Sequence, residues 1–300
     1  MFSRCSQGYY GTVCRPLLEL CRPFTLLAPF VGFLSAAVMA GRAFPPGSAY
    51  LGAISAMLLN AASNGLNQVF DIDIDRVNKP ARPLPSARLT KRQAGAAVVL
   101  LYIMSVALAA LVNWTFLLIV LFTAFVTFAY SAPPLRTKRV FWLANLTIAI
   151  PRGLLLIVAG WASVAEVDSA EPWFIGLVFG LFVLGAASTK DFADMEGDSA
   201  FGCMTLPIVI GVRRAAWVVA SSLVLPFLLI PAGVAAGLLS GNARALIALA
   251  IALIAWGAYA GYLLVRDPEQ LATERNHPSW KHMYLILLFA QIGMAISYLV

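Results

Sequence analysis

The sequence contains few charged residues and few residues that bind metals through sulfur or nitrogen. Only 12% of its 300 residues are charged and 61% are hydrophobic, whereas a soluble domain usually carries about 25% charged residues. This composition excludes an ordinary soluble fold. The four cysteines show no Cys-x-x-Cys spacing, so neither a metal site of that kind nor a disulfide framework is indicated. The two histidines, His277 and His282, are expected to lie in solvent.

Apolar runs recur along the whole chain, and each is long enough to cross a bilayer as a helix. Because lipid offers no hydrogen-bond partners to the backbone, helices are the expected spanning elements. We predict an all-α integral membrane protein that forms one polytopic domain over residues 1–300. Nine transmembrane helices are expected near 24–41, 48–70, 93–112, 115–132, 140–161, 172–190, 214–237, 243–265 and 281–299. They follow a basic amphipathic lead-in over 1–22, which lacks the pattern of a removable signal peptide.

The distribution of Lys and Arg predicts the orientation in the membrane. Of the 21 basic residues, Arg42 and Arg244 fall on one side and Arg152 lies inside a span, while the remaining 18 fall on the other side. By the positive-inside rule, the N-terminus is cytoplasmic and the C-terminus lies outside. Topology also accounts for the net charge of +7, so we expect no nucleic-acid partner. We expect a multi-pass protein of the cell membrane or inner membrane, and the oligomeric state is left open.

Two halves of the chain, about 24–132 and 140–300, form a weak repeat. In each half an apolar span ends in a cluster of acidic residues, which is followed by a loop that contains Pro or Gly. Gly176 and Gly180 are a small-x-x-x-small pair, which favours close helix packing. We expect both acidic clusters to line one central cavity on the cytoplasmic side.

The first acidic cluster closes the second span. Asn67, Asp71 and Asp75 are spaced by four residues, so on a helix they share one face, whereas Asp73 points nearly the opposite way. Carboxylates stacked on one face repel each other unless a cation lies between them. Oxygen ligands of this kind suit Mg²⁺, which one or two carboxylates commonly hold together with substrate phosphate oxygens.

The second acidic cluster closes the sixth span. Asp191, Asp194 and Asp198 again fall on one helical face, with Gly197 loosening the helix end. Basic residues flank both clusters, and a diphosphate bridged by Mg²⁺ and held by Lys and Arg fits such a surface. A diphosphate whose organic tail lies in the membrane would be a polyprenyl diphosphate.

Three segments resemble the signatures of the UbiA superfamily of intramembrane prenyltransferases. They are Asn67-x-x-x-Asp71-x-x-x-Asp75 continuing to Asn78-Lys-Pro-x-Arg82, then Tyr130-Ser131-x-Pro-Pro-Leu-Arg136-x-Lys138-Arg139, then Lys190-Asp191-x-x-Asp194-x-Glu-Gly-Asp198. The resemblance covers residues 20–300. It implies a nine-helix UbiA-like bundle around a central cavity that opens laterally to lipid.

The resemblance also implies the roles of individual residues. The catalytic carboxylates would be those of Asp71, Asp75, Asp191 and Asp198, which coordinate Mg²⁺ with help from Asn67 and Asp194. Diphosphate binding is expected of Arg22, Lys79, Arg82, Tyr130, Ser131, Lys138 and Lys190, with Arg136 and Arg139 ranked below Lys138. Trp280, beside Lys281, is expected to anchor the last helix at the membrane interface.

The chemistry implied is ionisation of an allylic diphosphate followed by capture of the cation by a lipophilic acceptor. Basic residues stabilise the charge of the leaving diphosphate, and an apolar cavity keeps water from the cation. Aromatic faces can stabilise the cation, and the candidates are Phe122, Phe125, Phe128 and Trp142. The prenyl chain is left open, with geranylgeranyl as one candidate.

The sequence leaves the acceptor undecided among an aromatic or quinone precursor, a glycerol-phosphate lipid and a chlorophyllide. Arg152 lies near the middle of the fifth span, where a charge is costly and usually functional. Together with Asn145, seven residues earlier on the same face, it is a candidate for binding an anionic acceptor. The alternative for Arg152 is pairing with carbonyl groups of another helix, or extension of the side chain toward the membrane surface (snorkelling).

A membrane transporter is the alternative of another class, since internal repeats and intramembrane polar residues also mark transporters. Transport sites lie near the middle of the membrane, whereas these carboxylates lie at the cytoplasmic ends of the spans. The sequence therefore favours the prenyltransferase.

Overall fold

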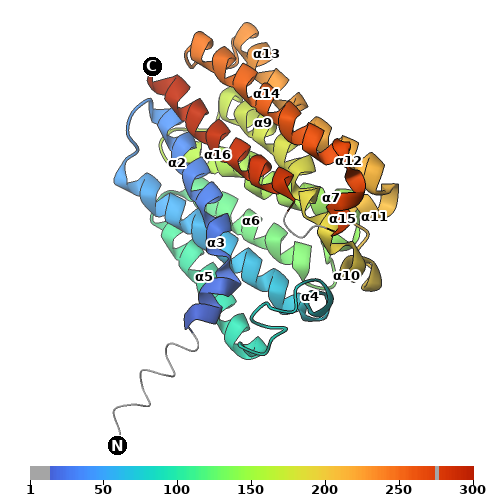
Figure 1. Cartoon of the computed structure of the whole chain (residues 1–300). Coiled ribbons are helices and arrows are strands. Elements are labelled where there is room, and N and C mark those ends of the chain that lie inside the picture. The colour runs from blue at the N-terminus through green and yellow to red at the C-terminus, as the bar shows by residue number, and fades with distance from the viewer. Residues whose placement is uncertain (1–13, 274–276) are drawn as a thin grey trace, which may run out of the picture.

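The computed structural model describes residues 14–273 and 277–300. In this part of the chain the regular elements are helices, apart from one isolated bridge between Val140 and Met204. Residues 14–21 of the expected lead-in are helical, and the helix ends before Arg22. The long helices run side by side in one bundle (Figure 1).

The helices begin and end within a few residues of the predicted spans. The first four spans are η1 (Pro23–Leu26) with α2 (Leu27–Gly41), α3 (Gly47–Phe70), α5 (Lys91–Ala110) and α6 (Trp114–Ser131). The fifth consists of α7 (Phe141–Ala149), a π-helical turn η3 (Ile150–Leu155) and α8 (Leu156–Ala162), and the sixth is α9 (Ala170–Ala186) with η4 (Ala187–Thr189). The seventh is α12 (Val212–Ser222), η6 (Leu225–Leu228) and α13 (Leu229–Ala235), followed by α14 (Ala243–Arg266) and α16 (Pro278–Leu299).

Eight helical segments in the described residues are long and apolar enough to cross a membrane. The expected ninth is α3, which has 24 residues, the same length as α14. It is less apolar than the others because Asn60, Asn64 and Asn67 form a polar stripe along it, and Asn60 and Asn64 are buried inside the bundle. A membrane protein fold is thus confirmed, while the count of nine spans and their orientation stay predictions.

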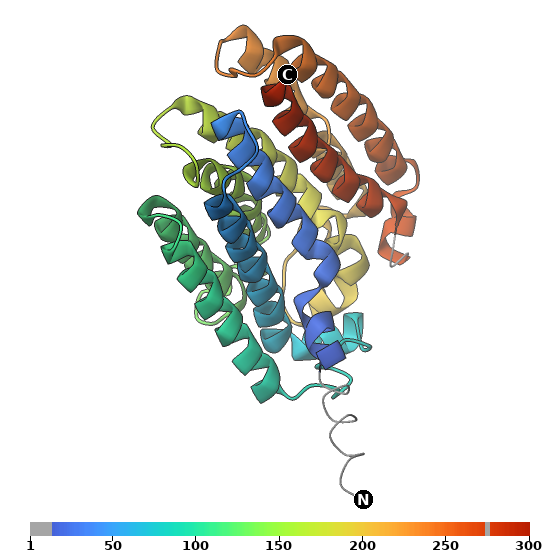
Figure 2. The ribbon, with the colours of Figure 1, turned by 90° about the vertical axis from the view of Figure 1, so that its left-hand side faces the viewer.

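The two ends of the bundle differ. Short helices α4 (Ile72–Asn78), α10 (Met195–Ala200) and α15 (Pro268–Thr273) gather toward one end, and α13 and the C-terminus lie toward the other (Figures 1 and 2). The acidic clusters are on the first end, since they lie in and beside α4 and α10.

At the far end of the bundle, Glu171 holds several connections together. Its carboxylate accepts hydrogen bonds from the backbone N–H and hydroxyl of Ser240 and from the Tyr298 hydroxyl. Arg42 donates to the Ser240 carbonyl oxygen at 2.8 Å. These contacts join the start of α9, the end of α16 and the loops after α2 and α13, so they fix the end opposite the acidic clusters.

Close packing of α9 on η3 fixes the middle of the bundle. A Cβ at Gly153 would lie 2.5 Å from the Cα of Gly180, and one at Gly176 would lie 2.8 Å from the Leu154 carbonyl oxygen. The close contact expected at Gly176 and Gly180 is therefore confirmed, and its partner is the π-helical turn that carries Arg152.

Asparagine and glutamine side chains of α3 hold the N-terminal segment against the bundle. Asn64 Nδ2 donates to the Cys21 carbonyl oxygen at 3.1 Å, and Gln68 Nε2 donates to that of Leu20 at 2.7 Å. Asn60 Nδ2 donates to the Thr25 carbonyl oxygen. The polar stripe of α3 thereby places Arg22, which lies between these contacts, beside the acidic clusters.

Candidate active site

A polar cavity opens at the end of the bundle that carries α4 and α10. It brings together nearly all of the residues expected in the site, although they come from separate elements of the fold. Its lining includes Arg22, Asn67, Asp71, Asp75, Lys79, Arg82, Tyr130, Lys138, Asn145, Arg152, Lys190, Asp191, Asp194 and Asp198. Both halves of the chain contribute to this one cavity, as the two acidic clusters predict.

The first acidic cluster spans a break between two helices. α3 ends at Phe70, and Asp71 has φ −110° and ψ 20° before α4 begins at Ile72. The four-residue hydrogen bonds nevertheless continue, from Asp71 N to Asn67 O at 3.0 Å and from Asp75 N to Asp71 O at 2.7 Å. The expected single helix is therefore wrong in detail, but Asn67, Asp71 and Asp75 still face one cavity.

Asp73 lies outside the cavity, as its register predicts. It forms an ion pair with Arg76 at 2.6 Å, and both side chains are about two-thirds exposed (67% and 64%). Such a solvated pair contributes little to stability. Asp73 therefore serves as a natural internal comparison for the buried carboxylates two residues away on either side.

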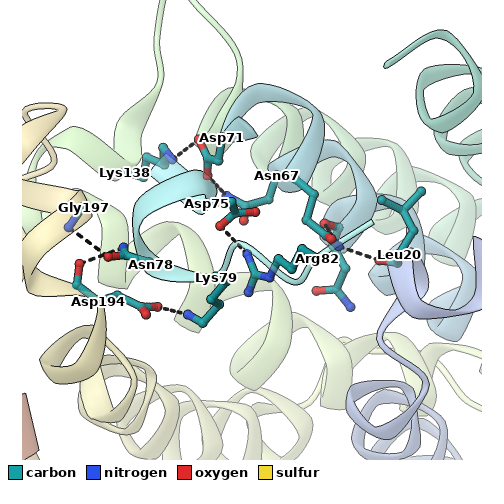
Figure 3. Close-up of polar contacts among 12 residues, drawn as sticks. Leu20, Asn67, Asp71, Asp75, Asn78, Lys79, Arg82, Lys138, Asp194 and Gly197 are labelled. Carbon is teal, nitrogen blue, oxygen red and sulfur yellow. Dashed lines mark hydrogen bonds and ion pairs between the residues drawn. The ribbon is translucent and has the colours of Figure 1, made fainter. Parts of the chain in front are cut away.

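The buried carboxylates of the first cluster are paired with basic residues (Figure 3). Asp71 binds Lys138 and, at 3.1 Å, Arg136, while Asp75 binds Arg82 at 2.5 Å. Asp71, Asp75 and Lys138 are each less than a tenth exposed. Arg136 is thus connected to the site through Asp71, although we expected it to be a weaker candidate than Lys138 for binding diphosphate.

The second cluster is irregular, contrary to the single helical face that we expected. A 3-10 turn, η5 (Asp191–Asp194), precedes α10, and the buried Phe192 faces away from solvent between the acidic residues. Asp191, Asp194 and Asp198 still line the polar cavity. Asp194 forms an ion pair with Lys79, which links the two clusters (Figure 3).

Asn78 is a site residue that the sequence analysis did not assign. Its Nδ2 donates to the Asp194 carbonyl oxygen at 2.9 Å, and its Oδ1 accepts from the Gly197 backbone N–H at 2.9 Å (Figure 3). A Cβ at Gly197 would lie 2.6 Å from the Asn78 side chain. Gly197 therefore permits this contact rather than loosening the helix end. The available signal was the place of Asn78 in the motif that continues from the first acidic cluster to Arg82.

The donor set fits Mg²⁺ shared between protein and phosphate. The Oδ2 atom of Asp75 is buried without a hydrogen-bond partner, and within the described ranges neither Asp191 nor Asp198 forms an ion pair. No three acidic, His or Cys side chains in the described chain converge as a ready-made metal site. Mg²⁺ needs only one or two carboxylates when phosphate oxygens complete its coordination, so this arrangement suits that mode.

Arg22 and Lys190 form a basic rim between the polar cavity and a second cavity, which is mostly apolar and lies deeper in the bundle. Both residues line the two cavities. Burial, followed by repulsion from Arg82, lowers the pKa of Arg22 to about 10, so its side chain remains charged at neutral pH. Cations crowded in this way favour binding of an anion.

Lys190 also contacts Trp280. The Lys190 Nζ lies 3.9 Å from the centroid of the Trp280 ring, which in turn stacks on Tyr284. Trp280 lines the apolar cavity. The ring is thus a cavity residue, and its role as an interfacial anchor stays a prediction.

Arg152 reaches into both cavities from η3, the π-helical turn. Its Nη2 donates to Asn64 Oδ1 at 3.3 Å, so the guanidinium group is held by a side-chain amide rather than by carbonyl groups of another helix. Asn145 lines the polar cavity, but its Nδ2 already donates to the Leu184 carbonyl oxygen and to the Ser188 hydroxyl. Asn145 therefore joins α7 to α9 while Arg152 faces the cavity.

Several expected site residues lie elsewhere. Ser131 is fully buried, its hydroxyl has no hydrogen-bond partner among the described residues, and it does not line the polar cavity. The four aromatic candidates are about half exposed on the outside of the bundle and line neither cavity: Phe122, Phe125, Phe128 and Trp142. Sequence spacing within α6 did not reveal which face turns inward.

The mostly apolar cavity adjoins the polar cavity on the side away from α4 and α10. Asn64, Thr127 and Arg152 line both. Farther from the acidic clusters its wall is made of aliphatic and aromatic side chains, among them Phe116 and Phe182. The aromatic residues that line the apolar cavity are these two, together with Tyr284 and Trp280.

The chain matches the model of the UbiA prenyltransferase family over residues 26–292. It is similar to digeranylgeranylglyceryl phosphate synthases of Thermococcus gammatolerans (30% identity, 92% of this chain and 96% of the relative) and Methanobrevibacter smithii (26%, 94% and 97%). Solved structures with the same fold include a digeranylgeranylglyceryl phosphate synthase (24% identity, TM-score 0.69, 95% of this chain and 98% of that chain). A UbiA homologue from Archaeoglobus fulgidus bound to GPP and Mg²⁺ is also similar (21%, TM-score 0.69, 93% and 99%).

Proposed function

Because the chain belongs to the UbiA prenyltransferase family and is therefore a membrane prenyltransferase, we propose that it transfers a polyprenyl group from its diphosphate to a glycerol-phosphate lipid. The observation that carries the proposal is the single cavity in which buried carboxylates and cations from both halves meet above an apolar cavity. That combination matches a substrate with a charged head and an apolar tail. The acceptor is favoured by the names of the two curated relatives.

The proposed Mg²⁺ ligands are the carboxylates of the polar cavity. Asp71, Asp75, Asp191 and Asp198 would hold the ions, with Asn67 and Asp194 assisting. When bound, Mg²⁺ neutralises negative charge on the diphosphate oxygens. The Archaeoglobus homologue bound to GPP and Mg²⁺ supports this assignment.

Basic side chains that now pair with the carboxylates are placed to bind the diphosphate. Lys138, Arg82 and Lys79 contact Asp71, Asp75 and Asp194 respectively, so their charges already lie beside the carboxylates that are proposed to hold Mg²⁺. These donors, with Arg22, Tyr130 and Lys190 nearby, would stabilise the charge that develops on the leaving group as the allylic C–O bond breaks.

The apolar cavity would hold the prenyl chain and protect the allylic cation from water. Tyr284 and Trp280, whose rings line this cavity next to Lys190, are placed to present aromatic faces near its polar end. The hydroxyl of the acceptor then captures the cation and loses its proton. The diphosphate would then remain in the polar cavity, and the new ether bond would form at the junction of the polar and apolar cavities.

Arg152 is proposed to bind the anionic part of the acceptor. It lines the junction of the two cavities and is held by Asn64. Since a charge inside a membrane protein is costly unless it meets a partner, an anionic lipid headgroup is a fitting ligand. We further propose that the cavity faces the cytoplasm, as the basic loops predict.

The test is a product assay with purified protein in Mg²⁺. Labelled geranylgeranyl diphosphate would be incubated with three acceptors in turn: geranylgeranylglyceryl phosphate, an aromatic acid and a chlorophyllide. We expect a product of the combined mass with the glyceryl phosphate, and loss of that product in excess chelator. Transfer to the aromatic acid or the chlorophyllide alone would contradict the acceptor, and activity that persists in chelator would contradict the metal.

A further inference from the structure

The two acidic clusters come from distant segments of the chain, and two consecutive residues at the end of α4 connect them. Asn78 is the last residue of α4, and Lys79 follows it. Both contact Asp194, which lies 116 and 115 positions farther along the chain (Figure 3). These two contacts tie the first cluster directly to the second.

The Lys79 contact is one that a bound substrate would disturb. It is an ion pair with the Asp194 carboxylate, and both side chains are partly exposed. In the function proposed above, Lys79 binds diphosphate and Asp194 assists Mg²⁺, so each group gains a competing partner when the site is loaded. This ion pair is therefore poorly suited to keep the clusters in place during the reaction.

The Asn78 contact has no such competitor. Its Nδ2 donates to the Asp194 carbonyl oxygen and its Oδ1 accepts from the Gly197 backbone N–H, both at 2.9 Å. The partners are backbone groups of η5 and α10, and the amide carries no charge. Because the two bonds leave one planar side chain, they fix both the distance and the orientation of α4 relative to the second cluster.

Both ends of this contact lie close to proposed metal ligands. Gly197 is buried and directly precedes Asp198, and Asn78 follows Asp75 by three residues in the same short helix. A Cβ at Gly197 would lie 2.6 Å from the Asn78 side chain, so only glycine permits the approach. A shift of α4 against α10 would consequently change the separation of the Asp75 and Asp198 carboxylates.

We propose that Asn78 is a positioning residue that holds the two carboxylate clusters at the spacing required by Mg²⁺ and diphosphate, a proposal that rests on the function proposed above. Asn78 acts through Asp75 and Asp198 and not on the reacting atoms. Removing a group that orients metal ligands without binding the metal typically lowers metal affinity by roughly 10–100-fold. Loss of Asn78 should therefore weaken Mg²⁺ binding beyond any loss of stability.

Asn113 provides a matched control because it makes the same two kinds of hydrogen bond. Its Nδ2 donates to the Ala162 carbonyl oxygen at 2.7 Å, and its Oδ1 accepts from the Phe116 backbone N–H at 2.8 Å. It lies at the start of α6, away from Tyr130 and the polar cavity. Alanine at either position removes an equivalent pair of bonds, but only one pair lies beside the carboxylates.

The first measurement is Mg²⁺-dependent binding of a labelled, non-ionisable geranylgeranyl thiolodiphosphate to the full-length protein in nanodiscs, which requires no acceptor. Asn78→Ala should raise the Mg²⁺ concentration for half-maximal binding about tenfold. Asn113→Ala should leave it within about twofold, since the change is distant from the site, although both variants should unfold at lower temperature.

Gly197→Ala approaches the same contact from the other side, and it tests the proposal even if Asn78→Ala fails to fold. It should raise the Mg²⁺ requirement to a similar extent. The double variant should be no worse than either single variant, because each change removes the same interaction. Fully additive effects would show that the two residues act separately and would overturn the proposal.

The second measurement needs neither metal nor substrate. Spin labels at Asp73→Cys and Ser199→Cys, in a background without the native cysteines, would report the position of α4 relative to α10 from exposed sites outside the polar and apolar cavities. The distance distribution should broaden in Asn78→Ala and stay unchanged in Asn113→Ala.

An unchanged Mg²⁺ requirement or an unchanged distance distribution in Asn78→Ala would overturn the positioning role. Absence of ligand binding by the unmodified protein would instead contradict the proposed function, and the label distances would then decide on Asn78 alone.

Discussion

At the residue scale, carboxylates of the polar cavity differ from surface carboxylates in their burial and in their partners. Asp75 is buried and pairs with Arg82 through Oδ1, and its Oδ2 has no hydrogen-bond partner in the part of the chain that the structure describes. Asp73, by contrast, is paired with Arg76 in solvent. Two acidic residues in one short helix thus have opposite surroundings. The difference makes their variants a matched pair.

Asp75→Asn should lower kcat/KM for prenyl transfer by about a hundredfold or more, because a neutral amide would replace a proposed metal ligand and electrostatic stabilisation of this kind is worth that much. Asp73→Asn should stay within about twofold, as expected for an exposed pair. Steady-state kinetics with saturating Mg²⁺ would measure both. Similar losses in the two variants would contradict the assignment of Asp75.

Arg152→Leu should raise the KM for the acceptor by about tenfold or more while changing the KM for the prenyl diphosphate little. The reason is that a hydrogen bond to a charged group contributes about 1.5–3 kcal/mol. Arg244→Leu, at an exposed position near the other end of the bundle, provides the control. Equal effects on both substrates would show that Arg152 does not select the acceptor.

At the scale of elements, the π-helical turn η3 and the glycines of α9 hold Arg152 at the junction of the cavities. Gly153 faces the backbone of Gly180 so closely that a methyl group has no space. Gly95 lies in the second turn of α5, and among the described residues nothing lies within 4 Å of a Cβ added there. The two glycines therefore respond to the same substitution in opposite ways.

Gly153→Ala should lower the free energy of unfolding by about 1–3 kcal/mol, since overpacking displaces α9, and it should lower activity through Arg152. Gly95→Ala should raise the free energy of unfolding by about 0.5–1 kcal/mol, because alanine restricts the unfolded chain and favours helix. Thermal unfolding in detergent would compare the two. A stable, fully active Gly153→Ala protein would contradict the close packing.

At the scale of the whole molecule, both acidic clusters lie at one end and the Glu171 contacts at the other. The rule that places basic loops inside predicts that the first end is cytoplasmic. Ser86 and Asn242 are exposed in loops at the two ends. They report orientation without touching either cavity.

In a background without the native cysteines, Asn242→Cys should react with a membrane-impermeant maleimide added to intact cells, whereas Ser86→Cys should react only after the membrane is opened. Labelling would be scored by the mass shift of the purified protein. The reverse pattern would place the active site outside and contradict the predicted orientation.

Much of the fold could be predicted because lipid imposes simple rules on a sequence. Apolar length placed the helices to within a few residues, and four-residue spacing identified the faces of the carboxylates despite the break at Asp71. Motif resemblance identified Lys138 and Asp191 as parts of one cavity. The assignment of the chain to two repeated halves stays a prediction.

The remaining features depend on which helix faces which, and only the tertiary structure decides that. The cavity-facing role of Trp280, the outward turn of Phe122 and the burial of Ser131 are set by helix rotation, to which a uniformly apolar span gives no signal. The use of Asn78 to join α4 to α10 depends on contacts between residues more than a hundred positions apart. The sequence thus determined the chemistry, by supplying carboxylates and cations at helix ends, while packing decided which side chains line the polar and apolar cavities.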